Sequence, residues 1–386
     1  MSNLYRKEWS EEQAKAILKS FSKMQDTLLL IIATRLESVS ELSEEELRRL
    51  ATASAMAEYL NEDMRSIKRA INQQNRVYAP LIAQIFENVK NENFELAKKY
   101  YIYRGLQIET VMSRASTVKL IKAMEKQVVS DLLNLSHTYC FDFDGDVMPV
   151  GKAYRKIVNE AVIRATSSGA SYRDFMKRAV NQLVQGGIKT LYWDSDNKKA
   201  TVRRADSHIR MNVMEGINRL NHELQELNGK EFGADGVETS LHSLCAPDHL
   251  PYQGRQFTLD EWEKINATLD RPWGTLNCQH FLSYIIIGVS EPVYSAQERD
   301  EARKRSNYTV EYKGRKMSRY EATQAMRARE RTIRYFKSAK KVFEKSGDKA
   351  SARKINEKLI AKRKEYATFC DSVGLVQRPE RLQFYY

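Results

Sequence analysis

Residues 67–86 read IKRAINQQNRVYAPLIAQIF, and their apolar residues recur at the three- and four-residue spacing of an α-helix. Polar residues fill the positions between them, which is typical of a helix with one buried face. Pro80 stands just before the second apolar group, where the first turn of a helix accepts it. The apolar groups are Ile67, Ala70 and Ile71, then Leu81, Ile82, Ile85 and Phe86. This stretch predicts two consecutive helices.

The same helical pattern extends in both directions, over residues 10–135. Ser10 with Gln13, and Ser43 with Glu46, have the spacing of a capping box, so we expect helices to begin there. No proline precedes Pro80. We therefore predict an all-helical N-terminal domain over residues 1–150. Its boundary falls where Asp, Gly and Pro interrupt the pattern between His137 and Gly151.

The middle of the chain, residues 151–298, has a mixed pattern. Alternating and β-branched residues, short Gly-rich turns and amphipathic stretches follow one another, which predicts a small α/β core. The expected elements are helices at 151–167, 171–185, 205–227 and 259–269 and a strand at 188–193 followed by a turn at 194–197.

Residues 299–386 are expected to form a basic helical arm. A helix near Ser295 leads to a β-hairpin at 308–317, turning at Lys313-Gly314. Two long amphipathic helices follow, separated by residues 346–348, so an αα-hairpin is predicted. The fold class is then mainly α with a small α/β (α+β) core, in a multidomain chain.

Charge is distributed very unevenly along the 386 residues. Residues 299–386 contain 25 Lys and Arg against 11 Asp and Glu, whereas residues 1–298 contain 38 against 39. The whole net charge of +13 is therefore carried by the C-terminal arm. A long cationic segment attracts phosphate backbones, which suggests packaged double-stranded DNA as a partner; a solvated helix face against an acidic protein is the alternative.

The residues expected to contact phosphates lie in the first long helix of the arm. Because the arginines are distributed around the helix without interleaved exposed aromatics, they favour phosphate contact or solvation over base recognition. The predicted residues are Arg327, Arg329, Arg331, Arg334, Lys337, Lys340 and Lys341.

Several classes of protein are excluded by composition. The longest purely apolar run, residues 28–33, is far shorter than the roughly 20 residues that span a bilayer. The N-terminus leads into charged sequence, so we expect no secretory signal. Four cysteines are too few for a disulfide framework, which favours a reducing compartment.

One 39-residue window concentrates side chains that bind metals. Cys245 and His249 are four residues apart, as on one side of a helical turn, and Cys278 and His280 are two apart, as on one face of a strand. Two thiols and two imidazoles match a tetrahedral Zn²⁺ site closed by protein ligands, which is a structural site. His242 is an alternative ligand, or a hydrogen-bonding partner of one.

Two other interpretations of this window stay open. The residues can be buried thiols and hydrogen-bonded imidazoles without a metal. Alternatively, Asp248 and His249 with Asn277 and His280 can belong to a metal-dependent nuclease, in which a histidine activates water. A cellular DNA-binding module is a further alternative. No nucleophile elbow, Gly-rich phosphate loop or supported catalytic carboxylate pair occurs, so the sequence favours a non-enzymatic protein.

The Asp-rich stretch at residues 141–146, FDFDGD, imitates the aspartate loop of a phosphatase or a calcium loop. It lacks the hydroxyl residue that follows the nucleophile in the first and the Glu at position twelve in the second. We interpret it as an interdomain turn.

The residues of the metal-binding window, together with the arm, resemble the family called phage minor capsid protein 2, which is related to phage head-morphogenesis proteins. The resemblance covers roughly residues 150–386. It rests on His242, Cys245, Asp248, His249, Tyr252, Gln253, Gly254, Phe257, Asn277, Cys278, His280 and Gly288, and on arm residues that include Tyr320, Gln324, Arg327 and Gly347.

The resemblance implies a structural, non-enzymatic minor component of a tailed-phage head. Such a protein would lie near the portal vertex inside the capsid, after assembly in the host cytoplasm. It would contact portal and capsid proteins and act in head assembly and in DNA packaging or delivery. A basic arm suits a protein that faces packaged DNA.

Overall fold

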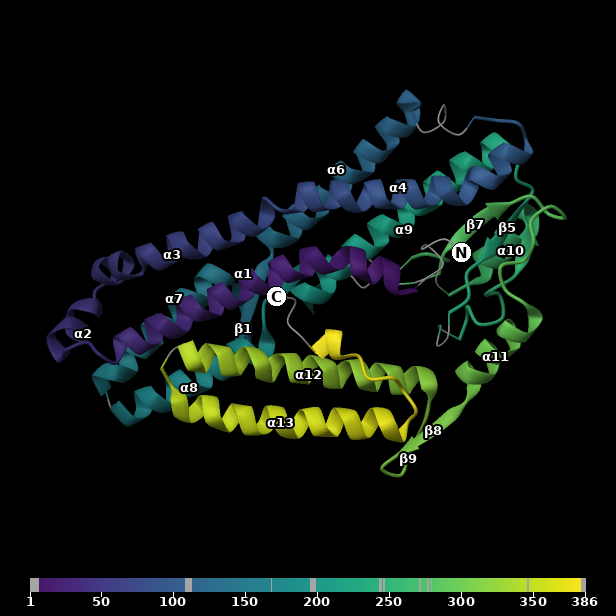
Figure 1. The fold of residues 1–386 in the computed structure, drawn as a ribbon. Helices are drawn as coiled ribbons and strands as arrows, with labels where there is room; N and C mark the ends of the chain where they lie inside the picture. The colour runs from purple at the N-terminus through teal and green to yellow at the C-terminus, as the bar shows by residue number, and fades with distance from the viewer. Residues whose placement is uncertain are drawn as a thin grey trace.

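The computed structural model, shown as a ribbon in Figure 1, describes most of the chain. The described residues are 7–107, 113–167, 169–194, 199–242, 245, 247–270, 272–275, 278, 280–345 and 347–382. The turn predicted at residues 194–197 lies outside them except for its first residue.

Long helices dominate the architecture, and three small antiparallel sheets accompany them (Figure 1). The helices are α1 (Lys7–Val39), α2 (Glu44–Leu50), α3 (Ala53–Asn75), α4 (Tyr78–Tyr103), α6 (Ala115–His137), α7 (Val150–Ser167), α8 (Gly169–Gly186), α9 (Ala205–Phe232), α10 (Leu259–Thr268), α11 (Ala296–Asn307), α12 (Arg319–Lys345), α13 (Lys349–Ser372) and the 3-10 turn η2 (Pro379–Leu382). The strands are β1 (Tyr139–Phe143), β2 (Asp146–Pro149), β3 (Lys189–Asp194), β4 (Lys199–Arg204), β5 (Gly236–Thr239), β6 (Gln256–Thr258), β7 (Leu282–Ile285), β8 (Thr309–Tyr312) and β9 (Arg315–Ser318). The fold class is mainly α with a small α/β component, as predicted.

A helix begins at its capping residue unless packing against the rest of the protein favours a different start. Ser43 caps α2, and the Glu46 carboxylate accepts a hydrogen bond from the Ser43 backbone N–H, which completes the predicted capping box. The predicted start at Ser10 is wrong, because α1 already begins at Lys7. Trp9 is buried in the main core, and its burial favours extending the helix past the capping residue.

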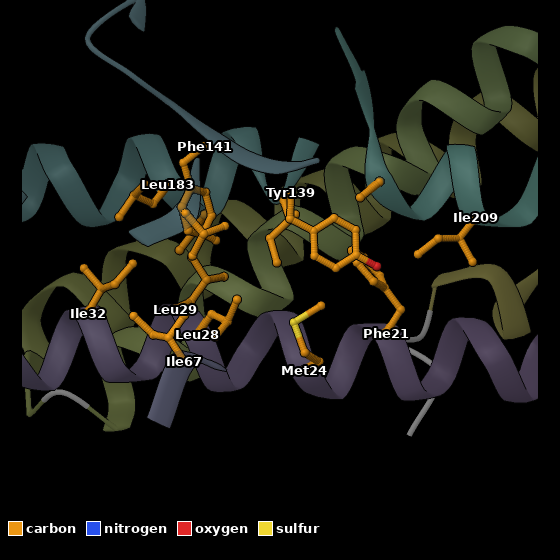
Figure 2. Close-up of a cluster of buried hydrophobic side chains, with 14 of the residues drawn as sticks. Phe21, Met24, Leu28, Leu29, Ile32, Ile67, Tyr139, Phe141, Leu183 and Ile209 are labelled. Carbon is orange, nitrogen blue, oxygen red and sulfur yellow. The ribbon is translucent and has the colours of Figure 1, made fainter. Parts of the chain in front are cut away.

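Helix α1 is the central element of the main core. Figure 2 shows Phe21, Met24, Leu28, Leu29 and Ile32 on α1, close to side chains contributed by other elements. Those partners include Tyr139 and Phe141 of β1, Leu183 of α8 and Ile209 of α9. Full burial of each large apolar side chain stabilises the fold by roughly 1.5–3 kcal/mol, so α1 holds these elements together.

The first sheet has the strand order β2-β1-β3-β4. Its β1–β2 hairpin contains the Asp-rich stretch, so the predicted turn is confined to Asp144 and Gly145, and the residues on either side of it form paired strands. Asp144 and Gly145 have φ values of 52° and 84°, as the tight turn of a two-residue hairpin requires. Phe141 and Phe143 are fully buried, and this burial selects the strand.

The second sheet, β6-β5-β7, lies with α10 at the right of Figure 1, next to the end of α9. Helix α9 runs to Phe232 and ends at Gly233, whose φ is 71°. The predicted end before Gly229 is therefore wrong. Gly229 lies inside the helix because the Tyr284 ring of β7 packs against it, where a Cβ would come within 2.6 Å of that ring.

The C-terminal arm has the predicted elements. The β8–β9 hairpin turns at Lys313 and Gly314, both with positive φ, and α12 and α13 form an αα-hairpin. Asp348 caps α13 by accepting a hydrogen bond from the Ser351 backbone N–H at 2.9 Å. The apolar stripes of the two helices are buried against each other, and that of α12 also packs on α1.

The main core contains side chains from all three predicted segments. Leu28 of α1, Ile209 of α9 and Phe343 of α12 all belong to one buried apolar cluster. The division of the chain at residues 150 and 298 stays a prediction. No helix within the described residues is long and apolar enough to cross a membrane.

Candidate metal centre and basic surfaces

The candidate ligands of the metal-binding window lie in two loops, which flank β6 and α10. One loop joins β5 to β6 and carries His249; the other precedes β7 and carries Cys278 and His280. These three side chains are 1%, 7% and 5% exposed. Their ligand atoms all lie within 4.8 Å of one another, and we call them the His-Cys-His group.

The distances within the His-Cys-His group fit one metal ion. His249 Nδ1 is 3.3 Å from His280 Nδ1, and Cys278 Sγ is 3.5 Å and 3.3 Å from these two nitrogens. Bond lengths of about 2.0–2.1 Å to nitrogen and about 2.3 Å to sulfur place tetrahedral ligands about 3.3 Å (N to N) and about 3.6 Å (N to S) apart. The donor set and its spacing therefore fit Zn²⁺.

The outer nitrogens of both histidines face oxygen atoms. His249 Nε2 is 3.5 Å from the Asp248 carboxylate, and His280 Nε2 is 3.2 Å from Gln253 Oε1. A histidine that donates its Nε2–H to an oxygen keeps the lone pair of Nδ1 for a metal. Both imidazoles are thus oriented as ligands.

Aromatic packing encloses the group. The Trp273 indole stacks on His249 at 4.8 Å and lies 4.1 Å from His280, measured between ring centroids. The His242 ring lies 4.6 Å from the His280 ring. Trp273 in turn meets Trp262 of α10 edge to face at 5.3 Å. The loops are therefore packed around the histidines on several sides.

Side-chain hydroxyls at the end of β5 and at the residue after it bind the backbone of both loops. Ser240 Oγ accepts a hydrogen bond from the Phe281 backbone N–H at 2.8 Å, which fixes the residue after His280. Thr239 Oγ1 donates to the Tyr252 carbonyl at 2.7 Å, close to His249 in the other loop. Gly254, with a φ of 68°, turns the chain toward β6.

The structure brings together three of the four predicted ligands. Cys245 is half-buried, and its sulfur is not among the atoms that gather in the His-Cys-His group. His242 lies beside the group as a ring neighbour. Cys278 and His280 lie ahead of β7, so the predicted strand placement is wrong, although their ligand atoms do converge. Asn277 lies outside the described residues.

Sequence reasoning missed the part that Gln253 plays. Its side-chain oxygen accepts from the His242 backbone N–H at 2.9 Å as well as facing His280, so it joins the two loops. Spacing alone does not reveal this, because Gln253 lies 27 residues from His280.

Several of the predicted phosphate-contact residues make contacts within the protein. The Arg329 guanidinium lies 4.0 Å from the Phe369 ring centroid, between α12 and α13. Lys341 Nζ is 3.0 Å from Asp26 of α1. Lys340 Nζ donates to Asn356 of α13 at 3.1 Å. Burial, together with the charge of Arg363, lowers the pKa of Lys337. The remaining three predicted residues, Arg327, Arg331 and Arg334, line a cavity beside α1.

Helix α13 presents a basic surface that the sequence analysis did not single out. Its buried apolar residues face α12 and the main core, and the rest of its surface is exposed and rich in lysine and arginine. The helical spacing of its buried positions would have identified this surface. We call it the α13 basic face; it consists of Lys349, Arg353, Lys354, Lys358, Arg363 and Lys364.

Comparison with known proteins identifies the family. The family model described as Phage minor capsid protein 2 matches residues 8–371, nearly the whole chain. The chain therefore belongs to the phage minor capsid protein 2 family. The match includes the N-terminal helices, which the sequence analysis had left outside the resemblance. No curated protein and no solved structure matches the chain.

Family membership defines the protein at a coarse level. It is a structural component of a bacteriophage capsid, its place is the virion, and its partners include other virion proteins.

Proposed function

We propose that this minor capsid protein occupies the portal-proximal part of the phage head and acts in head assembly and in packaging or delivery of DNA. The main support for this proposal is the strong positive charge of the arm, which lies on an exposed helix face of a phage head protein. Packaged DNA is the dominant polyanion inside a head. Portal and capsid proteins are the proposed protein partners, during assembly in the host cytoplasm and in the virion.

The α13 basic face is the proposed DNA-facing surface. Its charges are exposed, whereas Arg329 and Lys341 of α12 already contact residues of the protein. Exposed lysines and arginines contact the phosphate backbone without reading sequence, which suits a protein that meets any part of a genome.

The His-Cys-His group is proposed to hold a structural Zn²⁺. His249 and His280 would bind it through Nδ1 and Cys278 through its sulfur, with Asp248 and Gln253 orienting the imidazoles. When bound, the ion supplies a cross-link between the two loops. Within the described residues, the apolar cluster that this sheet shares with α10 has three buried members, Val237, Trp262 and Leu282, so a cross-link would add to the stability of that side of the sheet.

Quantitative mass spectrometry of purified phage particles tests the proposed location. Copy number is measured against the major capsid protein, in intact particles and in particles with portal vertices released. We expect a few copies per particle that co-purify with the portal. Absence from particles, or a copy number similar to that of the major capsid protein, would contradict the proposal.

A metal-dependent nuclease is the second candidate, and one observation favours it. Among the described residues three ligand atoms gather rather than four, and His280 also lines a cavity of about 390 Å³ with Trp262, Trp273 and His222. A catalytic zinc keeps one position for water, and a cavity would admit substrate. Zinc-loaded protein is incubated with plasmid DNA, and His249→Ala serves as the control. Cleavage by the wild type alone would support the nuclease.

A further inference from the structure

A cavity of about 260 Å³ lies where α1, α9, α12 and the C-terminal turn η2 meet. Arginine dominates its lining, and the arginines come from separate elements. We call it the arginine pocket; its arginines are Arg204, Arg210, Arg327, Arg331, Arg334 and Arg381.

The positive charge of the arginine pocket exceeds its negative charge. Three carboxylates, Glu11, Asp206 and Glu330, also line it, against six guanidiniums. Glu11 is shared, because its two oxygens lie 2.8 Å from Arg210 and 2.7 Å from Arg381. Among the described residues, the lining therefore contains three more guanidiniums than carboxylates.

The backbone adds to this positive potential. Asp206 and Ser207, in the first turn of the 28-residue helix α9, both line the pocket. The N-terminal end of a long helix carries the positive pole of its dipole. The Asp206 carboxylate partly offsets that pole: burial opposes its charge, but Arg204 and Arg334 outweigh burial and lower its pKa.

Arg327 is the residue most affected by this crowding. Burial, followed by the charges of Arg381 and Arg210, lowers the pKa of Arg327. Within the described part of the chain, its guanidinium forms no ion pair. Arg327 is half-buried, and Glu11 and Glu330 only partly offset the charges of Arg381 and Arg210. Its positive charge is therefore costly, and a bound anion would relieve that cost. Arginine is also the side chain best matched to phosphate oxygens, through paired N–H donors.

We propose that the arginine pocket binds a compact phosphate anion with two or more negative charges. The ligand class comprises inorganic phosphate, diphosphate and the terminal phosphate of a nucleotide or DNA strand. The volume accommodates such a group but not a DNA duplex. This inference goes beyond the proposed function, since it concerns neither the metal centre nor the α13 basic face.

Isothermal titration of the full chain with pyrophosphate, at constant ionic strength, tests the proposal. We expect saturable binding at one site, weakened about tenfold or more in R327Q/R331Q because each charged hydrogen bond to phosphate is strong. Arg65→Gln, at an exposed arginine of α3, is the matched control and should bind as the wild type does. Arg331→Gln alone, at an exposed position, provides a weakened variant if the double variant fails to fold.

Competition then separates the sources of phosphate. If a short duplex with 5′-phosphates displaces pyrophosphate, DNA ends are the source of the phosphate. If it does not, the ligand is a free anion. Either outcome agrees with phosphate binding in the arginine pocket. Two results would overturn the proposal. One is a titration with chloride that gives the same binding heat as the titration with pyrophosphate. The other is an unchanged affinity for pyrophosphate in R331Q and in the folded double variant.

Discussion

At the scale of single residues, the candidate metal centre depends on orientation more than on residue type. Asp248 and Gln253 face the outer nitrogens of His249 and His280, so that the inner nitrogens converge with the Cys278 sulfur. The sequence contains other thiols, such as Cys140, but burial raises the pKa of that thiol to about 11, which keeps it protonated and unsuited to a metal.

Cys278→Ser is expected to release zinc and to lower stability by about 3–4 kcal/mol, the linkage energy of a tightly bound ligand at saturating concentration. Metal content by mass spectrometry and thermal unfolding measure the two effects. Cys140→Ala, which removes a buried thiol outside the group, should retain zinc. A wild-type protein that is equally stable after chelation would contradict the proposed site.

Glu238 of β5 should make stability depend on pH. Its side chain is 1% exposed and accepts a hydrogen bond from the Val293 backbone N–H at 2.6 Å. Burial raises the pKa of Glu238, and this outweighs the hydrogen bonds and the charges of Lys99 and Arg299, which lower it. The folded state therefore keeps the proton to a higher pH than the unfolded state does.

Protonated Glu238 therefore stabilises the folded state at low pH. This stabilisation is fully present below the pKa of about 4.3 that Glu has in the unfolded chain, and it disappears as the pH rises through the pKa of Glu238 in the folded state. Glu238→Gln, which stays neutral, should not show that decrease. The free energy of unfolding, measured in urea across this range, tests it; identical pH profiles for the two proteins would contradict the assignment.

At the scale of elements, helix type and helix pairing followed from periodicity, and the ends of helices depended on packing. The row of apolar residues along one side of α12 and the similar row along α13 predicted the αα-hairpin, because each row must be buried against another apolar surface. Gly229 shows the opposite case, since a residue that usually ends a helix stays inside α9 to admit the Tyr284 ring. Burial of Phe141 likewise turned an expected loop into a strand.

The α13 basic face should account for much of the salt-sensitive DNA binding. R353Q/K354Q/K364Q removes three exposed charges and should make the slope of log K against log salt shallower by about 0.9 for each phosphate that the protein no longer neutralises. The matched control, R65Q/K68Q/R69Q, removes three exposed charges from α3. Fluorescence anisotropy with duplex DNA measures both; equally weakened binding in the two variants would show a general charge effect.

At the scale of the whole molecule, the three segments share a core. Because Phe343 and Val342 of α12 are buried in the cluster that contains α1, the arm contributes to the stability of the N-terminal helices. Deleting the arm therefore does more than remove charge, and charge-neutralising substitutions are the cleaner probe of DNA contact.

A chain ending at residue 318, without α12 and α13, should unfold at a lower temperature and be cleaved faster by protease than the full chain. Exposure of the apolar surface of α1 that α12 covers is the physical reason. Thermal unfolding and limited proteolysis compare the two. An unchanged melting temperature and cleavage rate would show that the arm folds as a separate domain.

The sequence by itself determined the helical class, the αα-hairpin, the cationic arm and the composition of the metal-binding window. These properties follow from local periodicity, charge and residue type, which neighbouring residues encode. Only the tertiary structure decided which ligand atoms converge, that Gln253 joins the two loops, that Arg329 and Lys341 contact the protein's own side chains, and that arginines from α9, α12 and η2 line one cavity. Those juxtapositions join residues far apart in sequence. They arise from the packing of separate elements: loops of the β6-β5-β7 sheet bring the ligand atoms together, and helices packed on one another bring the arginines together.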